Sequence, residues 1–185
     1  MSLRNHGTRG TDVMYTPAHA VHTLVAASDE IGLLTGLPEI WECAAGAGHI
    51  AKVLRRYGWD VLATDIAPAK KQVYPVTKLD FLKSSGPSGE RLGIASNPPY
   101  GTQSALAIAF LNHAFDVMQS RRGAIAFLLP FEFDAPASRN KIVGAHPWFV
   151  GKRTVARRIR WLNLPQAKHG PMGHHAWFML SLIHI

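Results

Sequence analysis

The chain has 185 residues, of which 47% are hydrophobic, 17% are charged and 9% are aromatic. This composition is typical of a globular domain and excludes disordered and fibrous classes of protein. The single cysteine, Cys43, excludes an intramolecular disulfide framework and any CxxC metal site. No apolar stretch reaches the roughly 18 residues of a membrane helix, and the polar N-terminus does not resemble a signal peptide. We therefore expect a cytoplasmic protein with no membrane partner and no metal.

The net charge of +8 lies in the C-terminal quarter of the chain. All 12 acidic residues lie at or before Asp134, so the last 51 residues carry eight basic residues and no acidic one. This asymmetry indicates a polyanionic partner, with nucleic acid as the leading candidate. A basic, solvated face on an ordinary enzyme is the alternative.

A cluster within this quarter combines cations with aromatic side chains, as nucleic-acid surfaces do. The predicted nucleic-acid contacts are Lys152, Arg153, Arg157, Arg158 and Arg160, with Trp148, Phe149 and Trp161 interleaved. Burial of the tryptophans in the core is the competing interpretation of the aromatic residues.

Hydrophobic spacing and turn residues predict alternating strands and helices. Residues 1–14 are predicted to form a loose arm and residues 15–185 a single domain. Thr16 and Pro17 are expected to open a helix to about residue 27, as N-cap and first-turn proline. Strands are then predicted at 39–43, 60–66, 78–82, 92–96 and 124–129, with helices at 49–57, 103–119 and 135–144.

Two further strands, near 154–164 and 176–182, have no clear helix between them. Such a pair predicts an antiparallel hairpin at the edge of the sheet. Strands alternating with helices otherwise predict a parallel sheet that is covered on both faces. The expected fold class is therefore α/β, with a mostly parallel sheet and an antiparallel C-terminal hairpin.

Polar residues follow several of the predicted strands at their carboxyl ends. The segment 42–48 follows the first strand, Asp65 ends the second, Asp80 lies at the third, and Asn97 follows the fourth. In open α/β sheets, ligands bind beyond the carboxyl ends of the strands. We therefore expect these four elements to line one ligand site.

The segment from Glu42 to Gly48 is a glycine-containing turn between a strand and a helix. Residues 46–51 fit the dinucleotide fingerprint GxGxxA, and Asp65 lies 19 residues after Gly46, where an acid would accept hydrogen bonds from ribose hydroxyls. A nicotinamide cofactor and S-adenosylmethionine both satisfy this pattern. The Glu42 carboxylate favours the cationic S-adenosylmethionine, because it would repel a pyrophosphate. An ion-pair role for Glu42 stays open.

The sequence Asn97-Pro98-Pro99-Tyr100 follows the predicted strand 92–96. Two prolines fix the backbone and remove two hydrogen-bond donors, which leaves a rigid loop rich in acceptors. The Asn97 side-chain oxygen and the Pro98 carbonyl could accept both N–H bonds of a planar amine and hold it against an electrophile. The Tyr100 ring could stack on the same substrate. The alternative is a tight structural turn.

With these motifs the sequence resembles the class I S-adenosylmethionine-dependent methyltransferases. The resemblance is to the amino-methylating, DNA adenine-type subgroup with an NPPY motif, in the compact form of phage and prophage enzymes. It implies a Rossmann-like seven-stranded sheet with an antiparallel last strand. It also implies that S-adenosylhomocysteine is the product of the cofactor, and that no separate target-recognition domain accompanies the catalytic domain.

The resemblance assigns roles to residues at each motif. It implies cofactor contacts from Tyr15, Thr16, Pro17, Glu42, Ala44, Gly46, Gly48, Asp65, Asp80 and Phe81. Within this set Asp65 would bind the ribose, and Asp80 with Phe81 would contact the adenine of the cofactor. It implies that the catalytic loop is Asn97, Pro98, Pro99 and Tyr100.

The implied reaction is methyl transfer to the N6 amine of an adenine flipped out of DNA. Four alternatives stay open at this point. A similar loop occurs in enzymes that methylate a ribosomal RNA base or a protein glutamine amide. A non-catalytic nucleic-acid-binding protein on the same core, or a nicotinamide oxidoreductase, would belong to another class.

Overall fold

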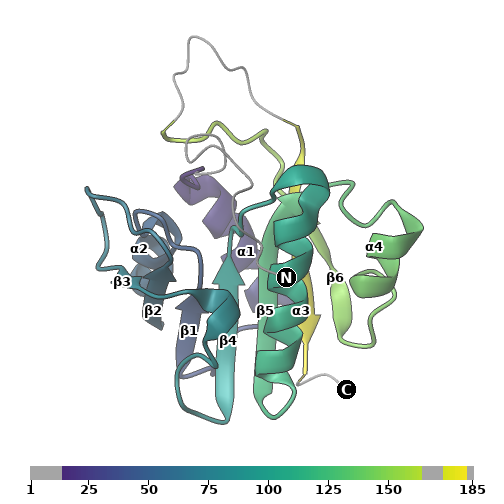
Figure 1. The fold of residues 1–185 in the computed structure, drawn as a ribbon, viewed down its shortest axis with the longest axis horizontal. Helices are drawn as coiled ribbons and strands as arrows, with labels where there is room; N and C mark the ends of the chain where they lie inside the picture. The colour runs from purple at the N-terminus through teal and green to yellow at the C-terminus, as the bar shows by residue number, and fades with distance from the viewer. Residues whose placement is uncertain (1–13, 164–172, 183–185) are drawn as a thin grey trace.

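The structure, a computed structural model, describes residues 14–163 and 173–182 (Figure 1). The predicted arm, apart from residue 14, lies outside the described residues. The strands are β1 (Glu39–Glu42), β2 (Asp60–Asp65), β3 (Thr77–Lys78), β4 (Arg91–Ser96), β5 (Arg122–Pro130), β6 (Phe149–Thr154) and β7 (His175–Ser181). The α-helices are α1 (Ala18–Ile31), α2 (His49–Arg56), α3 (Ala105–Met118) and α4 (Ala137–Ile142). Two 3₁₀ turns, Phe81–Lys83 and Thr102–Ser104, complete the elements.

The strands form one sheet in the order β3-β2-β1-β4-β5-β7-β6. Strands β1 to β5 pair in parallel, whereas β7 is antiparallel to both of its neighbours, β5 and β6. The predicted fold class, a mostly parallel sheet with an antiparallel C-terminal pair, is confirmed. Because β1, β2 and β4 run in the same direction, their carboxyl ends lie at one edge of the sheet.

Helices cover both faces of the sheet (Figure 1). Helices α1 and α2 share one apolar cluster with the sheet, to which Leu24, Leu54 and Trp177 contribute. Helix α3 covers the other face, where Leu111 and Phe178 belong to a second cluster. Strands β4 and β5 lie between these layers, which explains their nearly continuous apolar sequences.

The predicted first helix differs from the observed one at both ends. Pro17, not Thr16, is the N-cap residue of α1, and no side chain caps this end. The Thr16 hydroxyl instead accepts a hydrogen bond from Asn97. The helix continues four residues beyond the predicted end, to Ile31, and stops at Gly32 in the left-handed conformation.

Three other predicted elements are clearly shorter than expected, and one of them, the helix predicted at 135–144, is only Ala137–Ile142. The third strand is only Thr77–Lys78, because Asp80 accepts a hydrogen bond from the Leu82 backbone N–H and opens a 3₁₀ turn. The long helix begins at Ala105 and not at Gln103. Gln103 and Ser104 have φ of 53° and 65°, a left-handed conformation that cannot belong to an α-helix.

The predicted strand at 154–164 is wrong. The strand is β6, Phe149–Thr154, and residues 155–163 form an irregular segment beside α1. Val155, Ile159 and Trp161 are buried, and they belong to the apolar cluster of α1. Their spacing suggested a strand, but these side chains instead attach an irregular loop to α1 by packing against it. Strand β6 lies at the sheet edge and is mostly half-exposed, so it lacks a clear apolar signal.

Candidate active site

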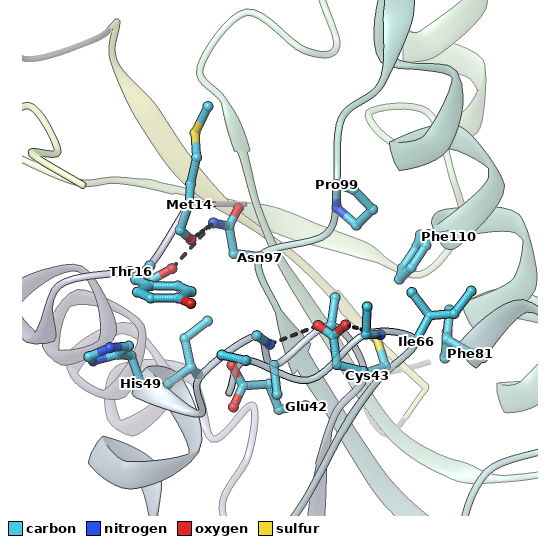
Figure 2. A pocket seen from close by; sticks show the side chains of 18 of the residues that line it. Met14, Thr16, Glu42, Cys43, His49, Ile66, Phe81, Asn97, Pro99 and Phe110 are labelled. Carbon is cyan, nitrogen blue, oxygen red and sulfur yellow. Dashed lines mark hydrogen bonds between the residues drawn. The ribbon is translucent and has the colours of Figure 1, made fainter. Parts of the chain in front are cut away.

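A cavity of about 460 Å³ lies at the carboxyl edge of the parallel strands (Figure 2). Ten of the residues predicted for the site line it: Tyr15, Thr16, Glu42, Ala44, Gly46, Asp65, Asp80, Phe81, Asn97 and Pro99. Four predicted residues do not line it, namely Pro17, Gly48, Pro98 and Tyr100. The chain therefore brings the glycine loop, the strand-end acids and the proline loop to one cavity.

Asp65 fastens the glycine loop to the end of β2. Its two carboxylate oxygens accept hydrogen bonds from the backbone N–H groups of Gly46 and Ala67, each at 2.8 Å. Gly46 has φ of +56°, and a Cβ at this position would lie 3.2 Å from the Tyr15 ring. Glycine is therefore required where the loop passes under Tyr15. Each Asp65 oxygen still has a lone pair for a further donor.

Gly48 has a packing role. Its φ is +83°, and a Cβ at this position would lie 2.7 Å from the Cβ of Tyr74. The absence of a side chain lets the start of α2 pack on the segment around Tyr74. The second glycine of the fingerprint thus faces the protein and does not line the cavity.

Glu42 places a carboxyl group in the cavity wall, with only 1% of the residue exposed to solvent. Its Oε2 accepts a hydrogen bond of 2.7 Å from the Ala51 backbone N–H in the first turn of α2. Burial, and then the nearby Asp65 charge, raise the pKa of Glu42 from 4.5 to about 8. No ion pair forms with Glu42 among residues 14–163 and 173–182.

Apolar side chains line the cavity beside Asp65 and Asp80. The buried Phe81 ring stacks on Phe110 with centroids 4.9 Å apart. Ile66, the residue after Asp65, also lines the cavity although it is 61% exposed. Ile66 and Phe110 were not predicted as site residues, although the position of Ile66 directly after a strand-end acid is a signal that could have identified it.

The cavity is lined by three carboxyl groups and one histidine. Glu42, Asp65 and Asp80 line it, and no lysine or arginine does so among the described residues. Burial and the nearby Lys52 lower the pKa of His49 below its usual value, which favours the neutral imidazole. A cation is therefore more compatible with this cavity than a phosphate.

The side-chain amide of Asn97 is held by three described neighbours. Its Nδ2 donates to the Met14 carbonyl and to Thr16 Oγ1, both at 3.3 Å. Its Oδ1 lies 3.2 Å from the Tyr100 hydroxyl, which can donate to it. Figure 2 shows the nitrogen turned toward Met14 and Thr16 and the oxygen turned away from them. Met14 was not predicted as a site residue.

Tyr100 lies behind the proline loop. Its hydroxyl is within 3.2 Å of the Leu128 carbonyl as well as of Asn97 Oδ1, and its ring stacks on His175 at 6.2 Å. Burial raises the pKa of the phenol well above its usual value, so the hydroxyl stays protonated. In this arrangement Tyr100 contacts Asn97, and its stacking on a substrate stays a prediction.

The N-terminal wall of the cavity is attached to the irregular C-terminal segment. The Tyr15 backbone N–H donates to Asn163 Oδ1 at 2.9 Å, and the Leu162 N–H donates to the Tyr15 carbonyl at 3.1 Å. The Tyr15 ring also packs on His49 with centroids 5.2 Å apart. The segment that carries the basic cluster therefore adjoins the cavity.

Two of the five predicted nucleic-acid contacts have acidic partners. Lys152 Nζ binds Asp134 at 2.8 Å and lies 4.4 Å from the Phe131 ring centroid. Arg153 pairs with Glu30 of α1. Both cations are therefore partly neutralised on the protein itself.

The other three cations are exposed. Arg157, Arg158 and Arg160 have no ion-pair partner in the described ranges. Trp161, predicted as a stacking residue, is only 2% exposed and packs in the α1 cluster. In this segment a partner could therefore contact the three exposed arginines but not the buried Trp161 ring.

Other chemistry is limited in the described residues. In the ranges 14–163 and 173–182, no group of three His, Cys, Asp or Glu residues is arranged to hold a metal ion. Cys43 is buried, and burial raises the pKa of its thiol well above the usual value, which disfavours the thiolate. No helix in the described part of the chain has the length and apolar character needed to cross a membrane.

Comparison by sequence finds no protein-family model and no curated protein that matches the chain. Comparison by structure finds methyltransferases. A candidate RNA methyltransferase from Pyrococcus horikoshii superposes with a TM-score of 0.69 at 15% identity, covering 96% of this chain and 90% of that one. A candidate class I S-adenosylmethionine-dependent methyltransferase from Listeria monocytogenes gives a TM-score of 0.59 at 15% identity, over 95% of this chain. The present chain spans 62% of the length of that protein.

A third structure contains ligands. The 1,6-didemethyltoxoflavin-N1-methyltransferase of Burkholderia thailandensis, with bound 1,6-didemethyltoxoflavin and S-adenosylhomocysteine, has a TM-score of 0.57 at 13% identity. The match covers 90% of this chain and 78% of that one. At such identities the likeness concerns the arrangement of the backbone. The chain therefore has the Rossmann-like fold of the class I methyltransferases.

Proposed function

We propose that this protein is an S-adenosylmethionine-dependent methyltransferase that methylates an exocyclic amine of a nucleic-acid base, the N6 amine of adenine in DNA. One observation carries the proposal. A single cavity joins three carboxyl groups, from Glu42, Asp65 and Asp80, to the amide of Asn97, without a lysine or arginine among its described lining residues. In this proposal residues 15–185 act as one catalytic domain.

The cavity fits the chemical groups of the cofactor. The Asp65 oxygens keep lone pairs for ribose hydroxyls, and Asp80 can accept from an adenine amine beside the Phe81 and Phe110 rings. Burial favours the protonated Glu42 carboxyl in the free protein, and a bound cation would lower the pKa of Glu42 and favour the carboxylate beside it. When bound, S-adenosylmethionine supplies a methyl group on a positively charged sulfur.

The same charges disfavour a nicotinamide dinucleotide. Its pyrophosphate would enter a cavity that contains three acidic side chains and no lysine or arginine among the described lining residues. Anions at such loops are usually stabilised by helix N-terminal N–H groups. Here the Ala51 N–H at the start of α2 already donates to Glu42.

Asn97 and Pro98 are the proposed acceptors for the target amine. An exocyclic amine donates two N–H bonds, which the Asn97 Oδ1 and the Pro98 carbonyl can accept. Accepting both hydrogens favours a tetrahedral nitrogen, whose lone pair is no longer delocalised into the ring and can face the methyl group. The nitrogen gains positive charge as it reacts, so acceptors stabilise it and a strong general base is not required.

The exposed arginines support nucleic acid as the substrate. Arg157, Arg158 and Arg160 lie on the segment that is joined to Tyr15 through Leu162 and Asn163. Phosphates bound there would place a nucleic acid beside the cavity. The fold shared with a candidate RNA methyltransferase keeps an RNA base as the second candidate.

The test is incubation of the protein with methyl-labelled S-adenosylmethionine and separate pools of DNA, RNA and total protein. Label in N6-methyladenine of DNA is the expected result. Label in an RNA base supports the second candidate, and label in a protein glutamine excludes a nucleic-acid substrate. Calorimetry with S-adenosylmethionine and with NAD provides the control. A non-catalytic protein on this fold would not bind S-adenosylmethionine, and a nicotinamide oxidoreductase would bind NAD.

A further inference from the structure

The amide of Asn97 can take two orientations that differ by exchange of its oxygen and nitrogen. In one, the NH2 group faces the N-terminal segment and the oxygen faces away; in the other, the positions are reversed. Only an oxygen can accept from the substrate amine that we propose. The choice between the two orientations therefore decides whether the site is competent.

The N-terminal segment determines this choice. The Met14 carbonyl has no hydrogen, so the atom 3.3 Å from it must be the amide nitrogen. The second N–H of the same nitrogen reaches Thr16 Oγ1, also at 3.3 Å. In the reversed orientation the Asn97 oxygen would face the Met14 oxygen and lose that hydrogen bond, and only the Thr16 hydroxyl could still donate to it.

The opposite side of the amide leaves the oxygen available. Tyr100 has one hydroxyl hydrogen but two acceptors at 3.2 Å, Asn97 Oδ1 and the Leu128 carbonyl. At most one lone pair of Oδ1 is therefore used by Tyr100, and the other can accept from a ligand. Asn97 lines the cavity, so this lone pair belongs to the site.

We propose that Thr16 is a positioning residue for Asn97. Its hydroxyl, together with the Met14 carbonyl, fixes the amide with its oxygen available to the substrate amine. This inference rests on the proposed function, and it gives Thr16 a role separate from contact with the cofactor. It also explains why Thr16, which lies just before α1, does not cap that helix. Its hydroxyl is bonded to Asn97 instead.

The geometry further restricts position 97 itself. In this chain the substitution Asn97→Asp would put a negative oxygen next to the Met14 carbonyl and would remove both donated hydrogen bonds. We therefore expect Asn97→Asp to be inactive at neutral pH, despite the similar shape of the two side chains.

The experiment compares Thr16→Val with Thr16→Ser. Valine keeps the shape and removes the hydroxyl, whereas serine keeps the hydroxyl. Thr23→Val is the matched control, because the Thr23 hydroxyl bonds the His19 carbonyl within α1 and does not contact Asn97. We expect Thr16→Val to lower kcat about 10- to 100-fold, Thr16→Ser to recover most of this loss, and Thr23→Val to stay close to the wild-type protein.

Two measurements separate positioning from other roles. The dissociation constant for S-adenosylmethionine, measured by calorimetry, should change by less than a few-fold in Thr16→Val. In spectra of the ligand-free, ¹⁵N-labelled protein, the side-chain NH2 signals that disappear in Asn97→Ala identify Asn97. These signals should shift and exchange faster with solvent in Thr16→Val but not in Thr23→Val.

Other outcomes overturn the inference. Weaker cofactor binding with unchanged kcat would make Thr16 a cofactor contact only. Unchanged Asn97 signals in Thr16→Val would show that the hydroxyl does not hold the amide. If the wild-type protein methylates no pool, the proposed function fails, and the NMR comparison alone then decides whether Thr16 fixes the Asn97 amide.

Discussion

The cavity and the basic segment 152–160 differ in how their charged side chains are held. In the cavity, Asp65 and Glu42 accept hydrogen bonds from backbone N–H groups of neighbouring turns. In the basic segment, Lys152 and Arg153 pair with acids from distant parts of the chain, Asp134 and Glu30. A backbone N–H group has one position in the folded chain, whereas a partner on a long side chain can move with that side chain.

This difference assigns separate tasks to the two regions. The cavity holds carboxyl and amide groups in fixed positions, as a chemical step requires. The exposed arginines contribute charge without fixed geometry, as binding to a phosphate backbone requires. Mutations in the two regions should therefore affect transfer and binding separately.

The largest effect is expected from Asn97→Ala. Removal of the acceptor oxygen leaves the target amine without its partner, so methyl transfer should fall about 100- to 1,000-fold or to background. The affinity for S-adenosylmethionine, measured by calorimetry, should stay within a few-fold, because Asn97 is not a predicted cofactor contact. Loss of cofactor binding in a folded Asn97→Ala protein would mean that Asn97 serves cofactor binding as well as methyl transfer.

Asp65→Ala should mainly weaken cofactor binding. It removes the acceptor of the Gly46 and Ala67 N–H groups and the proposed ribose contact together. Hydrogen bonds to a charged group contribute about 1.5–3 kcal/mol, so the dissociation constant for S-adenosylmethionine should rise by about 10-fold or more. Asp60→Ala is the control, because Asp60 starts β2 at the opposite end and pairs with Arg55. An equal loss in both variants would point to general damage to β2.

Charge reversal of Arg157 and Arg158 should weaken nucleic-acid binding and flatten its salt dependence. Each lost phosphate contact lowers the slope of log K against log salt by about 0.9 for duplex DNA. The matched variant Lys152→Ala/Arg153→Ala should change the slope less, since those cations are paired with Asp134 and Glu30. Equal slopes in the wild-type protein and the Arg157/Arg158 variant would remove these arginines from the interface.

The two regions were predictable from the sequence to different degrees. The ends of parallel strands meet at one edge whatever their exact length, so Asp65, Asp80 and Asn97 were assigned to one site without knowledge of loop geometry. The same reasoning failed for residues 154–164, where Ile159 and Trp161 gave an apolar spacing that reflects a loop packed on α1. Local periodicity does not distinguish an anchored loop from an edge strand.

The finer parts of the site required tertiary contacts. The Asn97–Thr16 hydrogen bond joins residues 81 positions apart, and the pairing of Arg153 with Glu30 joins residues 123 positions apart. No local pattern encodes such pairs. Gly48 matched a cofactor fingerprint, yet its missing side chain makes room for Tyr74, which only the path of the chain reveals.

Glu42 provides a pH-dependent test of the cavity. The pKa of Glu42 is about 8 in the folded protein and 4.5 when the carboxyl is exposed, so the folded state binds the proton more tightly. Its contribution to stability is therefore fully present below pH 4.5 and is lost as the pH rises to about 8. The loss for one such group cannot exceed about 1.4 kcal/mol per pH unit.

Glu42→Gln keeps the acceptor for the Ala51 N–H and removes the ionisation. Thermal unfolding of the wild-type protein between pH 5 and pH 8 should show a decline in stability that Glu42→Gln reduces. Glu39→Gln is a matched control at the other end of β1, because Glu39 is only partly buried and its pKa is raised less strongly by burial and Asp60. Identical pH profiles for wild type and Glu42→Gln would mean that the Glu42 carboxyl is ionised throughout this range. The cavity would then hold its negative charge before any cation binds.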